Sequence, residues 1–351
     1  MQQYIKKNYP AIYALLAALL FGLNAPLSKL LLQDVPPLFM ATFLYLGAGI
    51  GMSVIHLCQS GKKEAPLTKN EFPWAVGMIL LDVAAPVLLM YGLKHTTAAN
   101  ASLLFNFEMV ATSLIAFVFF KESIGSRIWT ALGIITLASL LLTVDFSNIK
   151  SLDFSLGSLL VLAACCCWGL ENNCTRNMSE KSPAQIVILK GFGSGLTALV
   201  IAFMAADSLK ISFLNILYAM LIGFTAYGLS IFFYVKAQRF LGAARTSAYY
   251  AAAPFAGVLL SIAILHEIPG WSFGIAFLLM IAGVWLILKE EHEHDHIHEN
   301  IVHNHSHEHN DLHHDHHHDF PVNGVHAHEH THCFCSHTHK HTPDIHHSHA
   351  H

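Results

Sequence analysis

Ten apolar stretches, each about as long as one membrane crossing, make up most of this 351-residue sequence. A helix needs roughly 20 apolar residues to cross about 30 Å of hydrocarbon, and it satisfies its own backbone hydrogen bonds inside lipid. We therefore predict an all-α integral membrane protein with ten transmembrane helices. The expected spans are residues 11–32, 36–58, 73–93, 98–120, 126–144, 155–175, 184–205, 213–235, 243–265 and 270–288.

The basic residues of the connecting segments predict which ends of the helices face the cytoplasm. If residues 1–10 are cytoplasmic, the inner segments collect 13 Lys and Arg residues, and the outer segments hold only Lys94, Lys150 and Lys210. Such an excess marks the cytoplasmic side of a membrane protein. With an even number of spans, the C-terminal tail (residues 290–351) is also cytoplasmic, and the expected location is the inner (plasma) membrane.

Short motifs recur along the chain at a nearly constant distance. "GAGIG" at residues 47–51 matches "GFGSG" at residues 191–195, an offset of 144. "AANAS" at residues 98–102 matches "AARTS" at residues 243–247, an offset of 145. These matches predict an internal repeat.

The repeat divides the apolar region into two five-helix units, residues 11–144 and residues 155–288. Because five is an odd number, the second copy must cross the membrane in the opposite direction to the first. Inverted repeats are typical of secondary transporters, whose substrate site lies between the two halves near the middle of the bilayer. The sequence therefore favours transport by alternating access.

Residues 11–288 resemble a known family in the motifs that open and close these units. "FGLNAPLSK" from Phe21 and "WGLENN" from Trp168 open the two units, and a Glu closes the fourth helix of each. In this the chain resembles the EamA-type transporters of the drug/metabolite transporter superfamily. The resemblance implies a transporter of amino acids, other metabolites or drugs, or of divalent metals as in members linked to nickel and cobalt resistance. It implies no enzyme activity, and the connecting loops are too short to build a catalytic domain.

Asp82 is the clearest candidate for the transport pathway. A charged group at membrane depth costs several kcal/mol unless it is paired or hydrated, so it is a functional candidate by default. Met78 and Met90 lie at four-residue multiples from Asp82, on nearly the same helix face. We assign all three to the pathway, although methionines also fill irregular gaps between helices.

Glu108 is a second candidate for the pathway, midway along the fourth span. The repeat places Ala253 at the equivalent position, so this acid is not needed by the scaffold that the two halves share. The alternative is a structural ion pair with Lys29 or Lys190, the two lysines inside spans.

Asn24 and Glu171 occupy matching positions in the first and sixth spans, and we assign both to the pathway. The alternative for Glu171 is an ion pair with Arg176 near the cytoplasmic end. A carboxylate buried between helices favours its protonated form over its ionised form. It can therefore exchange a proton for a cation, and protons are the expected coupling ion.

Glu122 and Glu267 recur in both halves beside the membrane surface, within "FKES" and "LHEI". Their presence in both halves favours a gating or scaffold role. We expect the same role for the glycine triplets of the second and seventh spans, because glycines four residues apart let helix backbones approach closely. The glycines concerned are Gly47, Gly51, Gly191 and Gly195.

The tail, residues 290–351, differs sharply from the apolar region. It holds 24 of the 27 histidines and 11 acidic residues against one Lys. Such a segment buries too little apolar surface to fold alone, so we expect it to be disordered. Neutral imidazole binds nickel, cobalt and zinc, and a His-rich tract is typical of metal binding. The expected ligands are His303, His305, His307, His309, His313, His314, His316, His317, His318, His326, His328, His330, His332, Cys333 and Cys335.

Two functional hypotheses follow. In the first, the protein exports a divalent transition metal, nickel or cobalt with zinc as a rival, and the tail collects or senses that metal. In the second, it exports a small metabolite, amino acid or drug, and the tail only senses or buffers metal. Neither requires a cofactor, and a homodimer is compatible with both. The acidic tail disfavours nucleic acid as a partner.

Overall fold

The computed structural model describes most of the apolar region and short parts of the tail. The described residues are 2–58, 67–120, 125–145, 153–178, 181–205, 211–234, 236–237, 249–288, 292–298, 302–307, 326–331 and 335–341.

The first half of the chain is helical, and its fourth span is divided into two helices. A short 3-10 helix, η1 (Lys69–Glu71), precedes α4, and the two-residue strand β1 (Val144–Asp145) follows α7. The helices are α1 (Gln2–Gly22), α2 (Asn24–Leu31), α3 (Pro37–Cys58), α4 (Phe72–His95), α5 (Ala98–Leu104), α6 (Phe107–Phe120) and α7 (Ser126–Thr143).

The second half begins with the strand β2 (Asp153–Phe154), which pairs antiparallel with β1. A π-helix, η2 (Gly223–Leu229), directly follows α10, and the two together lie in the eighth expected span of the chain. The helices are α8 (Leu156–Arg176), α9 (Pro183–Ala205), α10 (Phe213–Ile222), α12 (Ala253–Leu265) and α13 (Trp271–Leu288).

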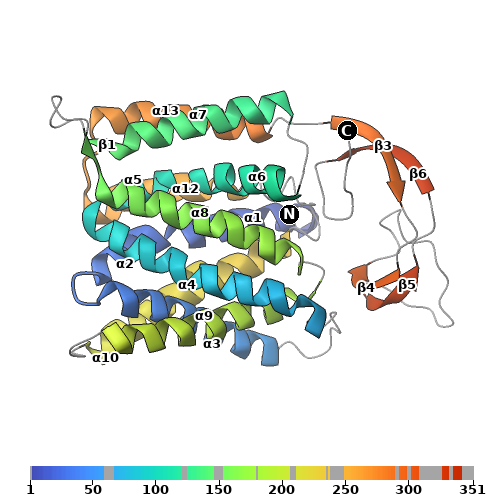
Figure 1. The fold of residues 1–351 in the computed structure, drawn as a ribbon, viewed down its shortest axis with the longest axis horizontal. Helices are drawn as coiled ribbons and strands as arrows, with labels where there is room; N and C mark the ends of the chain where they lie inside the picture. The colour runs from blue at the N-terminus through green and yellow to red at the C-terminus, as the bar shows by residue number, and fades with distance from the viewer. Residues whose placement is uncertain are drawn as a thin grey trace.

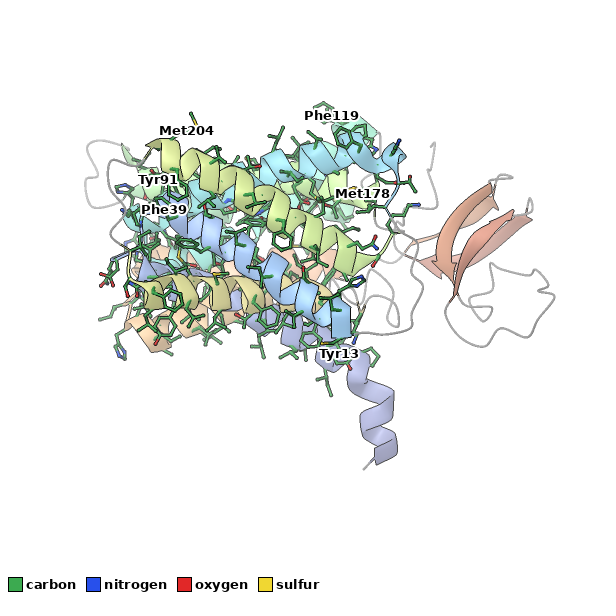
Figure 2. All side chains as sticks on the ribbon, turned by 90° about the horizontal axis from the view of Figure 1, so that it is seen from below. Tyr13, Phe39, Tyr91, Phe119, Met178 and Met204 are labelled. Carbon is green, nitrogen blue, oxygen red and sulfur yellow. The ribbon has the colours of Figure 1, made fainter. Side chains whose placement is uncertain are left out.

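The helices form a bundle in which neighbours run roughly parallel to one long direction (Figure 1). Figure 2 shows Phe39, Tyr91 and Met204 toward one end of the bundle and Tyr13, Phe119 and Met178 toward the other, as spans of alternating direction require. Seven helical segments in the described residues are long and apolar enough to cross a membrane, and two further apolar helices are shorter. The membrane-protein class is therefore clear, and the count of ten spans stays a prediction.

Several expected spans are interrupted near their middle. Leu23 separates α1 from α2, and Phe105 and Asn106 separate α5 from α6. Residues 251–252 form a turn directly before α12, 146 residues after the break between α5 and α6. Equivalent breaks therefore occur in the fourth span of each half, and the apolar pattern alone did not predict them because Phe105, Ala251 and Ala252 continue that pattern. Interrupted helices are a feature of transporter substrate sites.

The most extensive helix pairs join one half of the chain to the other. They are α4 with α8, α3 with α9, and α7 with α13. Buried apolar residues from nearly all helices form one continuous core, in which Met40, Leu44, Leu89 and Leu103 are completely buried. The interface between the halves is thus part of the core rather than a loose seam.

The tail contains short paired strands where it is described. β3 (His292–His298) pairs with β6 (Cys335–His341), and β4 (Val302–His307) pairs with β5 (His326–Thr331), both antiparallel. They lie outside the helical bundle (Figure 1). The expected disorder is therefore not found in these segments. Their sequence alternates His with other residues, a period of two that suits an extended strand.

Candidate functional site

Three buried charges meet where helices of the two halves pack together. The Lys190 Nζ lies 2.9 Å from the Glu171 Oε1 and 3.3 Å from the Asp82 Oδ2. Asp82 is 1% exposed and Glu171 is 2% exposed. A single ammonium group thus neutralises part of two buried carboxylates, one from each half of the chain, and Thr175 donates a further hydrogen bond to Glu171. We call Asp82, Glu171 and Lys190 the charged cluster.

A close crossing of α3 and α9 positions Lys190. A Cβ added to Gly191 would lie 2.4 Å from the Gly49 Cα and 2.9 Å from the Tyr45 carbonyl oxygen, so the two backbones touch here. Tyr45, one turn before Gly49, donates a hydrogen bond of 2.8 Å from its hydroxyl to the Asp82 Oδ1. The glycine crossing therefore brings Lys190 and Tyr45 to the same carboxylate.

A neutral polar pair adjoins the charged cluster. The Asn24 amide donates a hydrogen bond of 3.0 Å to the Tyr227 hydroxyl, and Ser28 donates one of 3.1 Å to the Asn24 Oδ1. The rings of Tyr227 and Tyr45 lie 5.4 Å apart between centroids. Through Tyr45, the Asn24–Tyr227 pair is connected to Asp82, so the polar network extends across both halves.

Glu108 lies on the flank of the charged cluster, in the first turn of α6. The Asn172 amide donates a hydrogen bond of 2.7 Å to the Glu108 Oε1 and also lies 3.3 Å from the Thr112 hydroxyl. Gly169 allows this approach, since a Cβ there would be 2.7 Å from the Ala111 Cβ. The alternative interpretation of Glu108 was a structural ion pair with Lys29 or Lys190, and neither lysine forms that pair.

The two lysines inside spans have other partners. Lys190 belongs to the charged cluster, and Lys29 donates hydrogen bonds to the backbone carbonyls of Leu93, at 2.8 Å, and of Thr96. Glu171 bonds Lys190, and the side chain of Arg176 lies outside the described residues. Sequence reasoning named Lys190 only as a possible partner of Glu108.

The two predicted pathway methionines pack in apolar surroundings. Met90 is completely buried in the main core, and Met78 is completely buried in a small cluster with Met178 and Ile186. Along α4, the order is Ala75, Met78 and then Asp82, at successive turns. The small cluster therefore lies between the charged cluster and the end of the bundle where Met178 is seen (Figure 2).

A groove of about 630 Å³ opens at that end of the bundle, with Glu71, Ala75 and Leu189 in its lining. The Lys181 Nζ lies 3.6 Å from the Glu71 Oε1 nearby and joins the two halves at the surface. Burial is the largest influence on the pKa of Glu71 and raises it. The hydrogen bonds from Thr68 and the charge of Lys181 outweigh burial and hold this pKa below its ordinary value.

Glu267 binds a helix N-terminus in the opposite half of the chain. Its two carboxylate oxygens accept hydrogen bonds of 2.8 Å each from the backbone N–H groups of Ala98 and Ala99, at the start of α5. Its neighbour His266 ends α12 in the left-handed conformation, with φ 51°. Glu122, the equivalent residue in the first half, lies outside the described residues.

The remaining predicted glycines all lie at close contacts. A Cβ at Gly47 would meet the Met220 carbonyl oxygen at 2.0 Å, and one at Gly51 would meet the Phe224 ring at 2.0 Å. A Cβ at Gly195 would lie 2.8 Å from the Leu46 side chain. These glycines therefore set the spacing of α3 against α9, α10 and η2.

Tyr45 and Tyr227 are polar residues of the site that sequence reasoning missed. Each lies in an apolar span, where its ring continues the apolar pattern, although a buried tyrosine hydroxyl usually finds a hydrogen-bond partner. The only available signal was the repeat, because an offset of 145 from Asp82 falls on Tyr227.

The predicted metal ligands of the tail have side chains that the structure does not describe. Among the residues it does describe, no group of three His, Cys, Asp or Glu is arranged to hold a metal ion. Metal binding by the tail therefore remains a prediction from composition.

Comparison with known proteins finds transporters. An uncharacterized transporter of Methanothermobacter thermautotrophicus is 26% identical over 301 residues, which cover 81% of this chain and 87% of that protein. The uncharacterized transporter YyaM of Bacillus subtilis is 23% identical over 271 residues, 75% of this chain and 88% of that protein. A crystal structure of another protein has a TM-score of 0.58 at 15% identity and covers 80% of this chain and 96% of that one. At that identity the likeness concerns the fold alone.

The sequence also matches the EamA-like transporter family twice, over residues 8–144 and over residues 155–289. The two matches include every helix that contributes to the charged cluster and to the Asn24–Tyr227 pair. Together they cover more than half of the chain. This multi-pass membrane protein therefore belongs to the EamA-like transporter family.

Proposed function

We propose that the protein is a proton-coupled secondary transporter that exports a small polar organic solute along a pathway between its two halves. The observation that carries this proposal is the charged cluster, in which Lys190 is shared by one acid from each half. Charged groups at membrane depth are costly, and in transporters they mark substrate or ion pathways. The interrupted helices beside them support the same location.

The charge of the cluster favours an organic solute over a bare divalent metal. The Lys190 ammonium already lies between the two carboxylates that a metal ion would need, and it would repel a second cation. A solute with its own hydrogen-bonding groups can instead exchange partners with Lys190, Asp82 and Tyr45. Such an exchange leaves the net charge of the site unchanged.

The apolar cluster of Met78, Met178 and Ile186 supports alternating access. It lies between the charged cluster and the groove at the predicted cytoplasmic end, where Glu71 and Lys181 also join the halves. We propose that these contacts close the pathway on the cytoplasmic side and separate when the protein opens inward.

A second candidate substrate is a divalent transition metal, nickel, cobalt or zinc. The observation that favours it is the composition of the tail, with 24 histidines in residues 290–351. Imidazole ligands suit these ions. On this proposal the tail, in the cytoplasm with residues 1–10, collects the metal and delivers it to the pathway in the inner membrane.

Transport assays in vesicles separate the two candidates. The full chain is reconstituted into proteoliposomes with an inward or outward pH gradient, and the flux of labelled amino acids is compared with that of nickel, cobalt and zinc. We expect amino-acid or related metabolite flux that follows the pH gradient. Flux of a metal ion alone would overturn the organic-solute proposal in favour of the second candidate.

Two variants connect the flux to the site. Asp82→Asn keeps the size of the side chain and removes its charge, and we expect at least a tenfold loss of flux. Asp34→Asn, the same substitution at an exposed residue between α2 and α3, is the matched control and should reduce flux far less. Equal flux in Asp82→Asn and the unmodified protein would remove the charged cluster from the pathway.

Deleting the tail tests its separate role. Truncation after residue 289 leaves all described helices in place. Under the first candidate, solute flux in vesicles is unchanged, and only metal binding by the protein, measured by equilibrium dialysis with nickel, is lost. Under the second, metal flux at low metal concentration falls with it.

A further inference from the structure

The buried acids of the site differ in what neutralises them. We propose that Glu108 is the group that binds the transported proton, while Asp82 and Glu171 remain committed to Lys190. This inference rests on the proposed transport function and assigns the coupling ion to one residue of that site.

Among the residues that the structure describes, Glu108 forms no ion pair. Its carboxylate accepts its hydrogen bond from the neutral Asn172 amide at 2.7 Å. Asp82 and Glu171, in contrast, lie 3.3 and 2.9 Å from the Lys190 ammonium. A proton on either of those acids must displace an ammonium group, whereas a proton on Glu108 displaces no charge.

Glu108 is also the most accessible of the three acids. Glu108 and Asn172 are both partly exposed, whereas Asp82 is only 1% exposed and Glu171 only 2% exposed. Glu108 therefore keeps accessible surface while the charged cluster is closed, and a proton can reach it without opening that cluster. The proton forms an O–H bond at the oxygen that does not accept from Asn172.

The other titratable groups around Glu108 come from several packed segments. They include one cation, Lys190, whose positive charge opposes a second cation at this position. The groups that interact electrostatically with Glu108 are Cys165 and Glu171 of α8, Lys190 of α9, Tyr227 of η2, and Tyr250.

These surroundings suit a proton better than a hard metal cation. Hard metal cations require about six to eight oxygen ligands. Asn172 instead presents its N–H donor to Glu108, and the Thr112 hydroxyl lies beside the same amide nitrogen. A proton needs no coordination shell and neutralises the carboxylate with one bond.

The repeat explains why an acid is tolerated here. Glu108 lies in the first turn of α6, directly after the break at Phe105 and Asn106. A helix N-terminus favours a negative charge. The equivalent residue, Ala253, starts α12 after the corresponding break and is buried. Both halves have the break, and only the first half has placed a proton acceptor at it.

Protonation of Glu108 has a direct consequence for the charged cluster. Hydrogen bonds to an ionised acceptor are roughly twice as strong as those to a neutral one, so the Asn172 bond weakens when Glu108 takes a proton. Asn172 follows Glu171 on α8. Weaker contact between α6 and α8 therefore frees the segment that holds Glu171 against Lys190, which couples the proton to the interface between halves.

Infrared spectroscopy of the full-length protein tests this with the proton as the probe. The protein is labelled with carbon-13 at the glutamate carboxyl carbons, reconstituted in lipid and titrated with acid. We expect a buried glutamic-acid C=O band that titrates apart from the surface carboxyls. This band should be lost completely in Glu108→Gln and kept in Asp82→Asn and in the surface control Glu71→Gln.

A second variant guards against misfolding. Glu108→Asp keeps the acid, and the band should move from the glutamate label to an aspartate label. If folded Glu108→Gln retains the band, or if Asp82→Asn loses it, the assignment is overturned. The spectrum needs no solute, so the two proposals can fail separately. A vesicle assay without flux would overturn the transport proposal and not the proton site. A spectrum without the expected band would overturn the proton site and not the transport proposal.

Discussion

Asp82 and Tyr227 occupy equivalent places in the two halves, 145 residues apart, and each bonds to groups of the other half. Asp82 meets Lys190, which also holds Glu171 of α8, and Tyr227 accepts from Asn24 of α2. The two positions are equivalent in the repeat, although the backbone is an α-helix at Asp82 and a π-helix at Tyr227, and one region is charged while the other is neutral.

This difference distinguishes the contacts that the fold requires from those that we assign to transport. The contact between the halves at this position requires only a hydrogen bond, as Asn24 and Tyr227 show. Such a bond contributes roughly 1 kcal/mol. Buried charges put several kcal/mol at risk, so a charged side chain at only one of the two equivalent positions, Asp82 and not Tyr227, fits the role beyond stability that we propose for it.

The largest effect is expected where the charged region is broken outright. Lys190→Met leaves Asp82 and Glu171 buried without their cation, and we expect a loss of about 3–5 kcal/mol of folding free energy. Thermal unfolding in detergent measures it. Adding Asp82→Asn and Glu171→Gln to this variant should recover most of the loss, and a Lys190→Met protein as stable as the original would contradict the pairing.

The helix crossing that aligns the two regions comes next. Gly191→Ala places a methyl group 2.4 Å from the Gly49 Cα, and overpacking of this kind costs typically about 1–3 kcal/mol. Gly133→Ala is the matched control, because no atom lies within 4 Å of its added Cβ. We expect a lower unfolding temperature for the first variant and an equal or higher one for the second. Equal behaviour would mean that α3 and α9 do not touch there.

A smaller effect is expected in the neutral region. Tyr227→Phe removes the hydroxyl that accepts from Asn24 and keeps the ring beside Tyr45, so we expect a loss of about 1 kcal/mol. Urea or thermal unfolding in detergent measures this loss. Flux in vesicles should fall less than in Asp82→Asn; a larger fall would show that the neutral region also belongs to the substrate pathway.

The smallest effect concerns the partly buried ion pair between the halves, Glu71 and Lys181. Because the folded-state pKa of Glu71 lies below its ordinary value of 4.5, the ionised Glu71 carboxylate, which the hydrogen bonds from Thr68 and then the charge of Lys181 stabilise, contributes to the stability of the fold above that pH. The contribution disappears as pH falls through the folded-state pKa. After screening by solvent it is less than about 1 kcal/mol. The free energy of unfolding of Glu71→Gln should be lower than that of the original protein at pH 7 and should converge with it in acid. An equal difference at both pH values would exclude the ionised Glu71 carboxylate as the cause.

The apolar pattern predicted the membrane class because burial in lipid requires long apolar helices whatever their neighbours are. The sequence also predicted that Asp82, Glu108 and Glu171 lie within spans, since a charged residue is conspicuous in an apolar stretch. It did not predict the partners of these acids. Lys190 lies far from Asp82 along the chain, and the pairing depends on how α4, α8 and α9 pack.

The helix breaks show the same limit. Leu23 and Phe105 are apolar residues that continue the pattern of a span, so the apolar pattern does not show the interruption, although Gly22 directly precedes the first break. The glycine motifs predicted close contacts without naming their partners. In the tail, the described segments alternate His with other residues and pair as strands, and the disorder of residues 290–351 as a whole stays a prediction.

The sequence by itself determined that this chain spans a membrane and consists of two related halves, because hydrophobic length and repetition are properties of the linear order. Only the tertiary structure decided which acid receives the ammonium of Lys190 and which is left with an amide. That choice follows from side chains of distant helices meeting at close backbone crossings, and their distances exist only in the packed bundle.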